Sequence, residues 1–169
     1  IEKTIQTEIE MLAGVRARAD YVIDTSTFTA AKFRERLSAL LEDNQLRDHS
    51  MLVNVSSFGF KYGIPLEADL VFDVRFLPNP YYDIALKEKS GLDSDVYEYV
   101  MKWPQTKEFL RHLHPMVDFL LPHYVEEGKT SLNIAIGCTG GRHRSVALTE
   151  ALADHISGLG YKCARIHRD

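Results

Sequence analysis

The stretch SLNIAIGCTGGRHRSV, residues 131–146, decides the fold class. Its first half, 131–137, is a short apolar run rich in branched side chains, which predicts a buried strand. From about 144 to 157, leucine and isoleucine recur at helical spacing, which predicts a helix. A loop of glycines and basic residues joins the two elements. The stretch therefore predicts a strand–loop–helix unit with polar side chains at the carboxyl end of the strand.

The loop at 138–145 has the composition of an anion site. A loop between a strand and a helix directs backbone N–H groups, and the positive end of the helix dipole, into its concavity. Gly140 and Gly141 permit a tight turn and a close backbone approach, while residues 142–144 supply positive charge. A phosphate group fits these features, so the unit is expected to be a phosphate-binding strand–loop–helix.

The same loop also resembles a catalytic motif. Cys138, Gly141, Arg144 and Ser145 fit C-x-x-G-x-x-R-S, the pattern of the cysteine-dependent phosphatases, whose thiolate attacks phosphorus. Such enzymes carry Trp-Pro-Asp upstream, whereas residues 103–105 read Trp-Pro-Gln, and glutamine cannot serve as a general acid. We therefore expect phosphate binding with no catalytic residue. Hydrolysis by Cys138 and Arg144 is the alternative, and a buried structural cysteine beside solvated arginines is a third interpretation.

The rest of the chain alternates helices with strands. Helices are predicted at 1–19, 33–41, 93–124 and 144–157, and strands at 19–26, 51–58, 68–76, 131–137 and within 158–169. Pro115 and Pro122 are expected to kink or divide the third helix. The polar stretch at 42–50 is the best linker. This order predicts an α/β fold, with a largely parallel sheet flanked by helices.

Ligands of such sheets bind beyond the carboxyl ends of the strands, where Lys61, Asp73 and Arg75 are expected together with the 138–144 loop. Asp73 and Arg75 are two residues apart on a strand and so share a face. They suit a hydroxyl or amine and the phosphate of one ligand, or equally an internal ion pair.

Composition narrows the class of protein. With 169 residues, 45% hydrophobic and 26% charged, the chain suits one folded core, or one domain with part of another. A net charge of −4 argues against a basic surface over the whole chain for nucleic acid. No apolar stretch spans a bilayer and no signal peptide opens the chain, so a cytoplasmic protein without membrane contact is expected. Its two cysteines are expected to be free thiols, and no metal-ligand spacing occurs.

Four separated strings resemble one family. They are SSFGFKYGIPLEADLVFDVRFLPNP at 56–80, GLD at 91–93, IGCTGGRHRSV at 136–146 and the closing HRD. Together they resemble the RapZ/YvcJ family of bacterial nucleotide-binding proteins, or RNase adapters, over the chain from about Asp20. Tyr62 and Tyr81 replace histidines of the enterobacterial pattern, and with these tyrosines the sequence is more similar to the Gram-positive YvcJ type.

The resemblance implies two parts. Residues 1–47 would be the tail of a P-loop kinase-like domain with ATPase and GTPase activity, and 48–169 a regulatory domain that binds ligand and RNA. The expected ligand is a phosphorylated amino sugar, glucosamine-6-phosphate. The Walker A motif is absent from this sequence, so ATP or GTP with Mg²⁺ is expected only in the preceding domain, and no cofactor in this chain. Small RNA, protein partners and a homo-oligomer are the other implied partners.

The resemblance also assigns residues. The implied ligand-binding set is Cys138, Thr139, Gly140, Gly141, Arg142, His143, Arg144, Ser145, Asp73 and Asn79. The implied RNA-binding set is Lys61, Arg75, Arg142 and Arg168. The resulting hypothesis is a sensor, in which a bound metabolite phosphate alters contacts with RNA, with a protein partner or with the nucleotide-binding domain.

Overall fold

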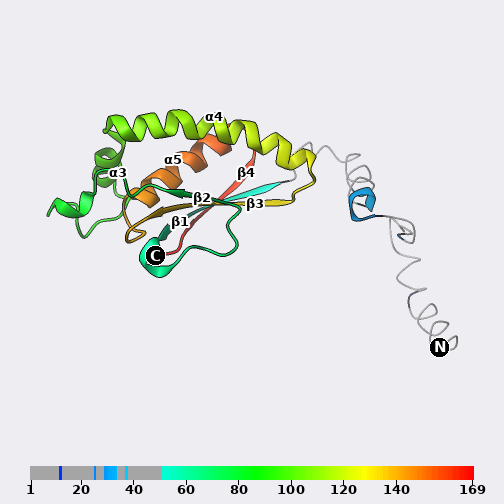
Figure 1. Cartoon of the computed structure of the whole chain (residues 1–169), viewed down its shortest axis with the longest axis horizontal. Helices are drawn as coiled ribbons and strands as arrows, with labels where there is room; N and C mark the ends of the chain where they lie inside the picture. The colour runs from blue at the N-terminus through cyan, green and yellow to red at the C-terminus, as the bar shows by residue number, and fades with distance from the viewer. Residues whose placement is uncertain (1–11, 13–24, 26–28, 34–36, 38–50) are drawn as a thin grey trace. The chain divides into compact units, whose positions relative to one another are not determined.

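The structure is a computed structural model that describes residues 12, 25, 29–33, 37 and 51–169 (Figure 1). The chain divides into two compact units, Ile1–Leu46 and Arg47–Asp169. In the first unit the described residues 12, 30–33 and 37 are helical. Residues 12, 33 and 37 lie within the helices predicted at 1–19 and 33–41, whereas residues 30–32 show that the second helix begins before its predicted start. The remainder of those helices, the strand predicted at 19–26 apart from residue 25, and the linker predicted at 42–50 lie outside the described residues.

The second unit is built on a four-stranded sheet whose strands are all parallel. The strands are β1 (Leu52–Gly59), β2 (Leu70–Asp73), β3 (Ser131–Cys138) and β4 (Lys162–His167), in the order β2-β3-β1-β4. Every pair is parallel, so the four carboxyl ends lie at one edge of the sheet. This confirms the predicted α/β class and the parallel sheet.

β2 is shorter than the strand predicted at 68–76. The strand ends at Asp73 because its carboxylate accepts the backbone N–H of Arg75 at 2.9 Å, which turns the chain. Short 3₁₀ helices follow two strand ends: η1 (Phe60–Tyr62) after β1, and η2 (Pro80–Tyr82) beyond β2. No α-helix separates β1 from β2.

The helix predicted at 93–124 is two helices, α3 (Ser94–Met101) and α4 (Pro104–Glu126). The break precedes Pro104, since a proline disfavours helical geometry in the residue before it, and Trp103 is extended with φ −75° and ψ 138°. The prediction that Pro115 and Pro122 would divide the helix was wrong. Both lie inside α4 on its exposed side, where water can take the carbonyls that proline leaves unbonded.

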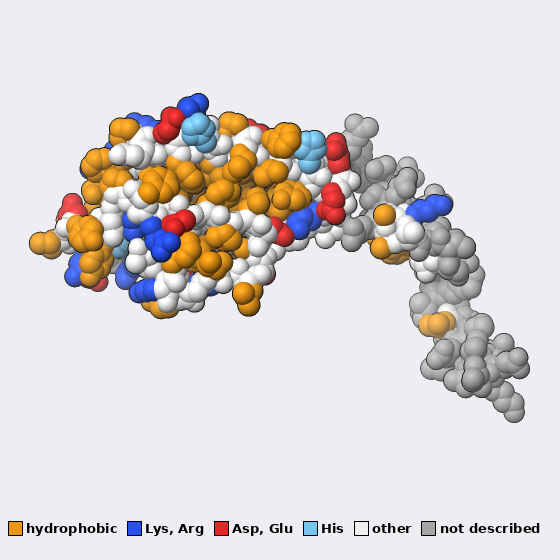
Figure 2. Space-filling view, viewed as in Figure 1, with side chains coloured by type: hydrophobic (Ala, Val, Ile, Leu, Met, Phe, Trp, Pro, Cys, Tyr) orange, Lys and Arg blue, Asp and Glu red, His pale blue; other side chains and the backbone are white. Residues whose placement is uncertain are grey.

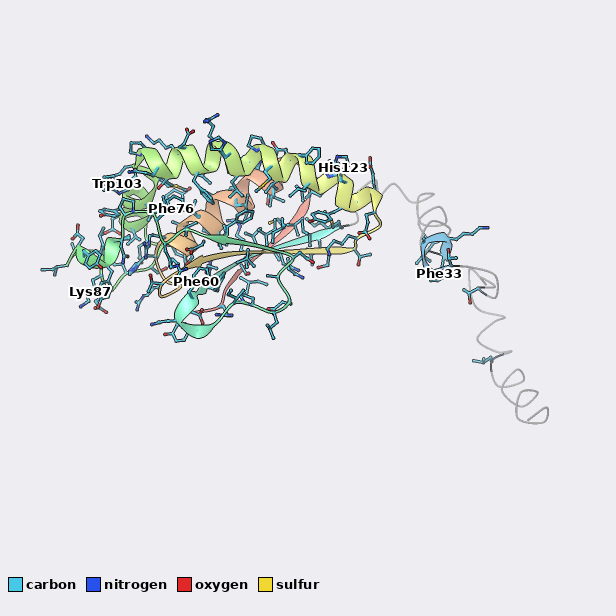
Figure 3. All side chains as sticks on the ribbon, viewed as in Figure 1. Phe33, Phe60, Phe76, Lys87, Trp103 and His123 are labelled. Atoms are coloured by element: carbon cyan, nitrogen blue, oxygen red, sulfur yellow. The ribbon has the colours of Figure 1, made fainter. Side chains whose placement is uncertain are left out.

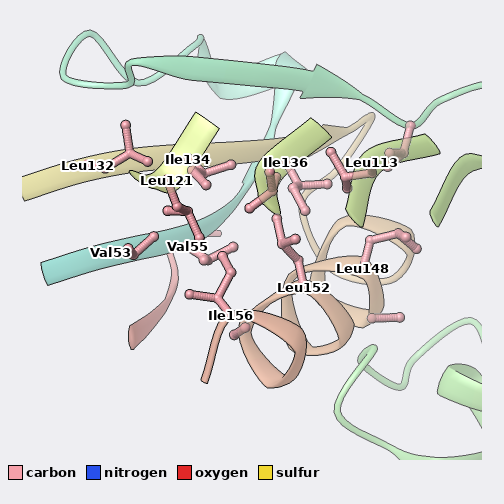
Figure 4. Packing of buried hydrophobic residues seen from close by; sticks show 14 of the residues in the cluster. Val53, Val55, Leu113, Leu121, Leu132, Ile134, Ile136, Leu148, Leu152 and Ile156 are labelled. Atoms are coloured by element: carbon pink, nitrogen blue, oxygen red, sulfur yellow. The ribbon is translucent and has the colours of Figure 1, made fainter. Parts of the chain in front are cut away.

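The core lies between the sheet and two helices, α4 and α5 (Arg144–Gly158), which cover the same face (Figures 1 and 4). Both crossovers, β2 to β3 and β3 to β4, move in the same direction along the sheet, and right-handed connections then place both helices on one side. The buried contacts come from Val53, Val55, Leu132, Ile134 and Ile136 of the sheet, Leu113 and Leu121 of α4, and Leu148, Leu152 and Ile156 of α5.

The other face of the sheet is more polar. Asn54 donates from Nδ2 to Oδ1 of Asn133 at 2.8 Å and to Oγ of Ser131 at 3.3 Å. Hydrophobic side chains also reach the surface between α4 and the β2 edge (Figure 2), where Phe109 contacts the rings of Phe72 and Phe76. No helix among the described residues has the length and apolar character needed to cross a membrane.

Candidate anion-binding site

A cavity of about 800 Å³ opens at the carboxyl edge of the sheet. Its lining comes from η1 after β1, the segment after β2, the end of β3 with its loop, the start of α5 and Asp169 after β4. The lining residues are Lys61, Tyr62, Asn79, Tyr81, Tyr82, Lys87, Glu88, Cys138, Thr139, Gly140, Arg142, His143, Arg144 and Asp169. The volume suits a small organic molecule rather than a bare ion.

The 138–145 loop forms one wall of this cavity. Cys138 ends β3, Gly141 turns the chain with φ +79°, and α5 begins at Arg144. The loop lies directly against the end of β1, because a Cβ atom at Gly59 would stand 2.7 Å from the carbonyl carbon of Gly140. This close packing places the amino end of a 15-residue helix at the cavity, as the strand–loop–helix prediction requires.

The basic side chains of the loop bind carbonyl groups of neighbouring segments. Arg142 donates to the carbonyl of Glu88, and His143 donates from Nε2 to the carbonyl of Lys87 at 3.1 Å. Arg144 donates from Nη1 to the carbonyls of Arg75 and Leu77, each at 2.9 Å. The sequence predicted these residues as sources of charge. The structure shows that they also attach segments 75–77 and 87–88 to the loop.

Arg144 is the most buried of these cations, with 4% of its surface exposed. Its Nη2 donates to Oγ1 of Thr139 at 3.3 Å, but its buried Nε has no partner among the described residues. A buried donor of this kind normally has a hydrogen-bond partner. Arg144 lines the cavity, so this residue provides both positive charge and an unused donor at the amino end of α5.

The pKa of the Cys138 thiol reflects the hydrogen bonds and charges around the loop. The side chain is 3% exposed, and burial acts to raise its pKa. Hydrogen bonds from the hydroxyl and backbone N–H of Ser145 and from the backbone N–H of Gly141, with the charge of Arg144, outweigh burial and lower the pKa below its usual value. The loop therefore favours negative charge at its centre.

Two lysines stand at the rim. Nζ of Lys61 lies 4.0 Å from the position of a Cβ atom at Gly140, and 4.4 Å from the ring centroid of Tyr62. Nζ of Lys87 lies 4.9 Å from the ring of Tyr81 (Lys87 is labelled in Figure 3). In the part of the chain that the structure describes, neither ammonium group forms an ion pair. Both are thus available to an anion that enters the cavity.

Most of the residues implied by the resemblance line the cavity. These are Asn79, Cys138, Thr139, Gly140, Arg142, His143 and Arg144 of the ligand set, and Lys61 of the RNA set. Gly141 and Ser145 belong to the loop but stand behind its surface. Asp73 and Arg75 form an exposed ion pair at 2.6 Å, which lowers the pKa of Asp73, and neither lines the cavity. Arg168 binds the carbonyl of Gly63 at 2.6 Å.

The predicted ligand and RNA sets did not include six lining residues: Tyr62, Tyr81, Tyr82, Lys87, Glu88 and Asp169. Asp169 follows β4, so the rule that ligands bind at the carboxyl ends of parallel strands could have found it. No local pattern signals Lys87 and Glu88. They reach the cavity because their carbonyls accept hydrogen bonds from the loop, and those contacts are not visible in the sequence.

The triplet at 103–105, which stands where the cysteine-dependent phosphatases carry Trp-Pro-Asp, is not part of the cavity. Trp103 precedes α4 and Gln105 lies in its first turn, and neither lines the site. Among the described residues there is also no group of three or more His, Cys, Asp or Glu that could hold a metal ion.

Burial of His143 predicts a pH dependence of stability. The pKa of His143 is lowered from about 6.5, chiefly because burial disfavours the charged ring. Hydrogen bonds to backbone carbonyls act to raise this pKa, and the charge of Arg142 acts to lower it further. A lowered pKa gives stability that is present above pH 6.5 and is lost as pH falls. We expect the free energy of unfolding to drop between pH 7.5 and 5.5, with a smaller drop in His143→Gln. Urea titrations at both pH values test this, and equal drops would contradict it.

Comparison with known proteins identifies the family of the unit that carries the cavity. A sequence model described as the RapZ C-terminal domain matches residues 51–169, the unit that carries the sheet and the cavity. The chain belongs to the RapZ C-terminal domain family. The matched range contains all four strands and every residue that lines the cavity.

The relatives of this RapZ-family chain are longer proteins. A nucleotide-binding protein of Caldicellulosiruptor saccharolyticus is 52% identical over 169 residues, which are the whole of this chain and 57% of that protein. A nucleotide-binding protein of Acetivibrio thermocellus is 50% identical over 167 residues, 99% of this chain and 57% of the relative. A nucleotide-binding protein of Staphylococcus aureus is 49% identical over 166 residues, which are 98% of this chain and 54% of that relative. The chain thus spans little more than half the length of these relatives.

Proposed function

We propose that this RapZ-type domain binds the phosphate group of a phosphorylated amino sugar, such as glucosamine-6-phosphate, at the 138–145 loop. The observation that carries the proposal is the buried Arg144, which lines the cavity at the amino end of α5 and whose Nε lacks a partner among the described residues. A phosphate oxygen supplies the missing acceptor. Arginine and a helix amino terminus are both preferred partners of phosphate.

Binding without hydrolysis is the better-supported chemistry. The lowered pKa of Cys138 favours a nucleophile, but the sulfur is buried and lies 3.2 Å from the hydroxyl of Ser145. A phosphatase also needs an acid that protonates the leaving group, and Gln105 neither has that chemistry nor lines the cavity. We therefore assign Cys138 to the wall of the site rather than to catalysis.

A regulatory role is the second half of the proposal. The loop is hydrogen-bonded to segments 75–77 and 87–88, which lead to the exposed Tyr81 and Tyr82. A phosphate that competes for Arg142 or Arg144 would loosen those contacts and so favour one arrangement of the surface. Occupancy would then alter contacts with a small RNA, a protein partner, another copy of the chain or the nucleotide-binding part of the full-length cytoplasmic protein.

RNA binding ranks below ligand binding in this proposal. Of the four basic residues in the RNA set, Arg75 is paired with Asp73, Arg142 binds the carbonyl of Glu88, and Arg168 binds Gly63 and Asp169. Lys61 faces the cavity. Engaged cations contribute less to a phosphate backbone than free ones, because their present contacts must first be broken.

Calorimetric titration tests the proposal directly. We expect the 169-residue chain to bind glucosamine-6-phosphate, glucose-6-phosphate and inorganic phosphate, without phosphate release in the same samples. Lys61→Ala should weaken all three by roughly tenfold, because it removes a cation beside the loop. Lys107→Ala, on the exposed side of α4, is the matched control and should change nothing.

Two results would overturn the proposal. Failure of all three compounds to bind would remove the anion site. Release of phosphate that disappears in Cys138→Ser would make the domain a cysteine-dependent phosphatase instead.

A further inference from the structure

The cavity carries charges of both signs. Its lining includes the cations Lys61, Lys87, Arg142 and Arg144, and two carboxylates, Glu88 and Asp169. A phosphate alone would be attracted by the first group and repelled by the second. A ligand that carries a positive group besides its phosphate satisfies both, so the position and partners of the carboxylates decide where that group would bind.

Asp169 is fixed in place by β1. The N–H of Gly59 donates to its Oδ2 at 2.7 Å. The two residues before it are held as well: Nδ1 of His167 lies 2.9 Å from Oγ of Ser57, and the N–H of Arg168 donates to the carbonyl of Ser57 at 3.1 Å. The end of β4 is therefore an ordered continuation of the sheet, and its carboxylate has a defined position.

One oxygen of this carboxylate remains available. Gly59 and the guanidinium of Arg168, at 3.1 Å, both use Oδ2. Among the described residues Oδ1 has no hydrogen-bond partner, and 13% of the side chain is exposed. Glu88 differs, because it is an exposed residue of the rim whose contact with the loop is made by its backbone carbonyl.

Asp169 also lies against the phosphate loop. A Cβ atom built on Gly141 would come within 2.8 Å of the Cβ of Asp169, so only glycine leaves room for this approach. A phosphate held by the loop would therefore lie within the length of a small molecule from Oδ1 of Asp169. The same loop residue that turns the chain thus sets the spacing between the anion and the carboxylate.

We infer that Asp169 is a specificity-determining residue that accepts a hydrogen bond from a charged amino group of the phosphorylated ligand. The inference rests on the proposed function, since a phosphate in the 138–145 loop is what brings the amino group to Oδ1. A hydroxyl and an ammonium group can both donate a hydrogen bond to the carboxylate, but only the ammonium group adds Coulomb attraction between opposite charges. Asp169 therefore favours an ammonium group over a hydroxyl at the same position of the ligand.

Two sugar phosphates provide the test, because glucosamine-6-phosphate and glucose-6-phosphate differ only in an amine against a hydroxyl. Titrated at pH 7, the chain should prefer the amine by roughly tenfold. Asp169→Asn keeps the size and the acceptor for Gly59, so it should retain its melting temperature and bind both compounds about equally. Glu127→Gln, which removes an exposed carboxylate that does not line the cavity, is the matched control and should keep the preference.

A second variant separates the carboxylate from its ion pair. Arg168→Gln removes the cation but leaves Asp169 charged, so the preference for the amine should persist or grow. Equal binding of both compounds by the unchanged chain, or an unchanged preference in Asp169→Asn, would overturn the assignment of Asp169 and leave the phosphate site standing. Absence of binding by either compound and by inorganic phosphate would overturn the proposed function, and this inference with it.

Discussion

Replacement of Arg144 by alanine is expected to lower the free energy of unfolding by about 2–5 kcal/mol and to abolish phosphate binding. The change leaves the carbonyls of Arg75 and Leu77 without their donor, and each unsatisfied buried acceptor costs about 1–3 kcal/mol. It also removes the most buried cation of the loop. Urea unfolding measures the first effect and calorimetric titration the second.

Arg142→Ala is the matched control for this result. Arg142 belongs to the same loop and also donates to a carbonyl, that of Glu88, but it is exposed, so water can replace the lost donor. Its loss of stability should stay below about 1 kcal/mol. Similar losses in the two variants would show that burial of Arg144 does not hold the 75–77 segment to the loop.

Gly91→Ala should have the second large effect. The N–H of Gly91 donates to the carbonyl of Arg142 at 2.9 Å, which holds the GLD stretch against the start of α5. A Cβ atom there would lie 2.6 Å from the backbone N of Ala147 and closer still to the carbonyl oxygen of His143. Backbone cannot yield as a flexible side chain does, so we expect a loss of at least about 2 kcal/mol.

Thermal and urea unfolding test the Gly91 prediction, with Gly158→Ala as the control. Gly158 ends α5, and a Cβ atom built on it meets nothing within 4 Å. Alanine there should be neutral or slightly stabilising, because it favours helix and restricts the unfolded chain. If Gly91→Ala unfolds at the same urea concentration as the unchanged chain, the two segments are not packed as described.

Apolar runs and helical spacing that alternate along the sequence made much of the second unit predictable. The apolar run at 131–137 and the helical spacing after 144 each correspond to an element, and alternation of strands with helices predicted the parallel sheet. The division of the long helix was predicted at Pro115 or Pro122, but it occurs before Pro104. That proline acts on Trp103 before it, whereas Pro115 and Pro122 face water.

The site was less predictable than the fold, for a physical reason. A residue type indicates what a side chain can bind, but the partner is set by distance in space. In the sequence Arg144 is typical of a phosphate ligand, yet in the structure it also donates hydrogen bonds to two carbonyls that lie about 70 positions away in sequence. The free oxygen of Asp169 depends in the same way on Gly59 and Gly141, which meet only when the sheet has formed.

The strand order β2-β3-β1-β4 has a consequence for synthesis of the protein. β1 is synthesised early but pairs with β3 and β4, which are synthesised last. The backbone of β1 therefore has no partner strand on either side until almost the whole domain has left the ribosome. The cavity needs the ends of these strands and Asp169 beyond β4. A metabolite that binds there would select completed chains over nascent ones and stabilise them in proportion to its concentration. The concentration of the ligand would then influence what fraction of newly made chains reaches and keeps the folded state.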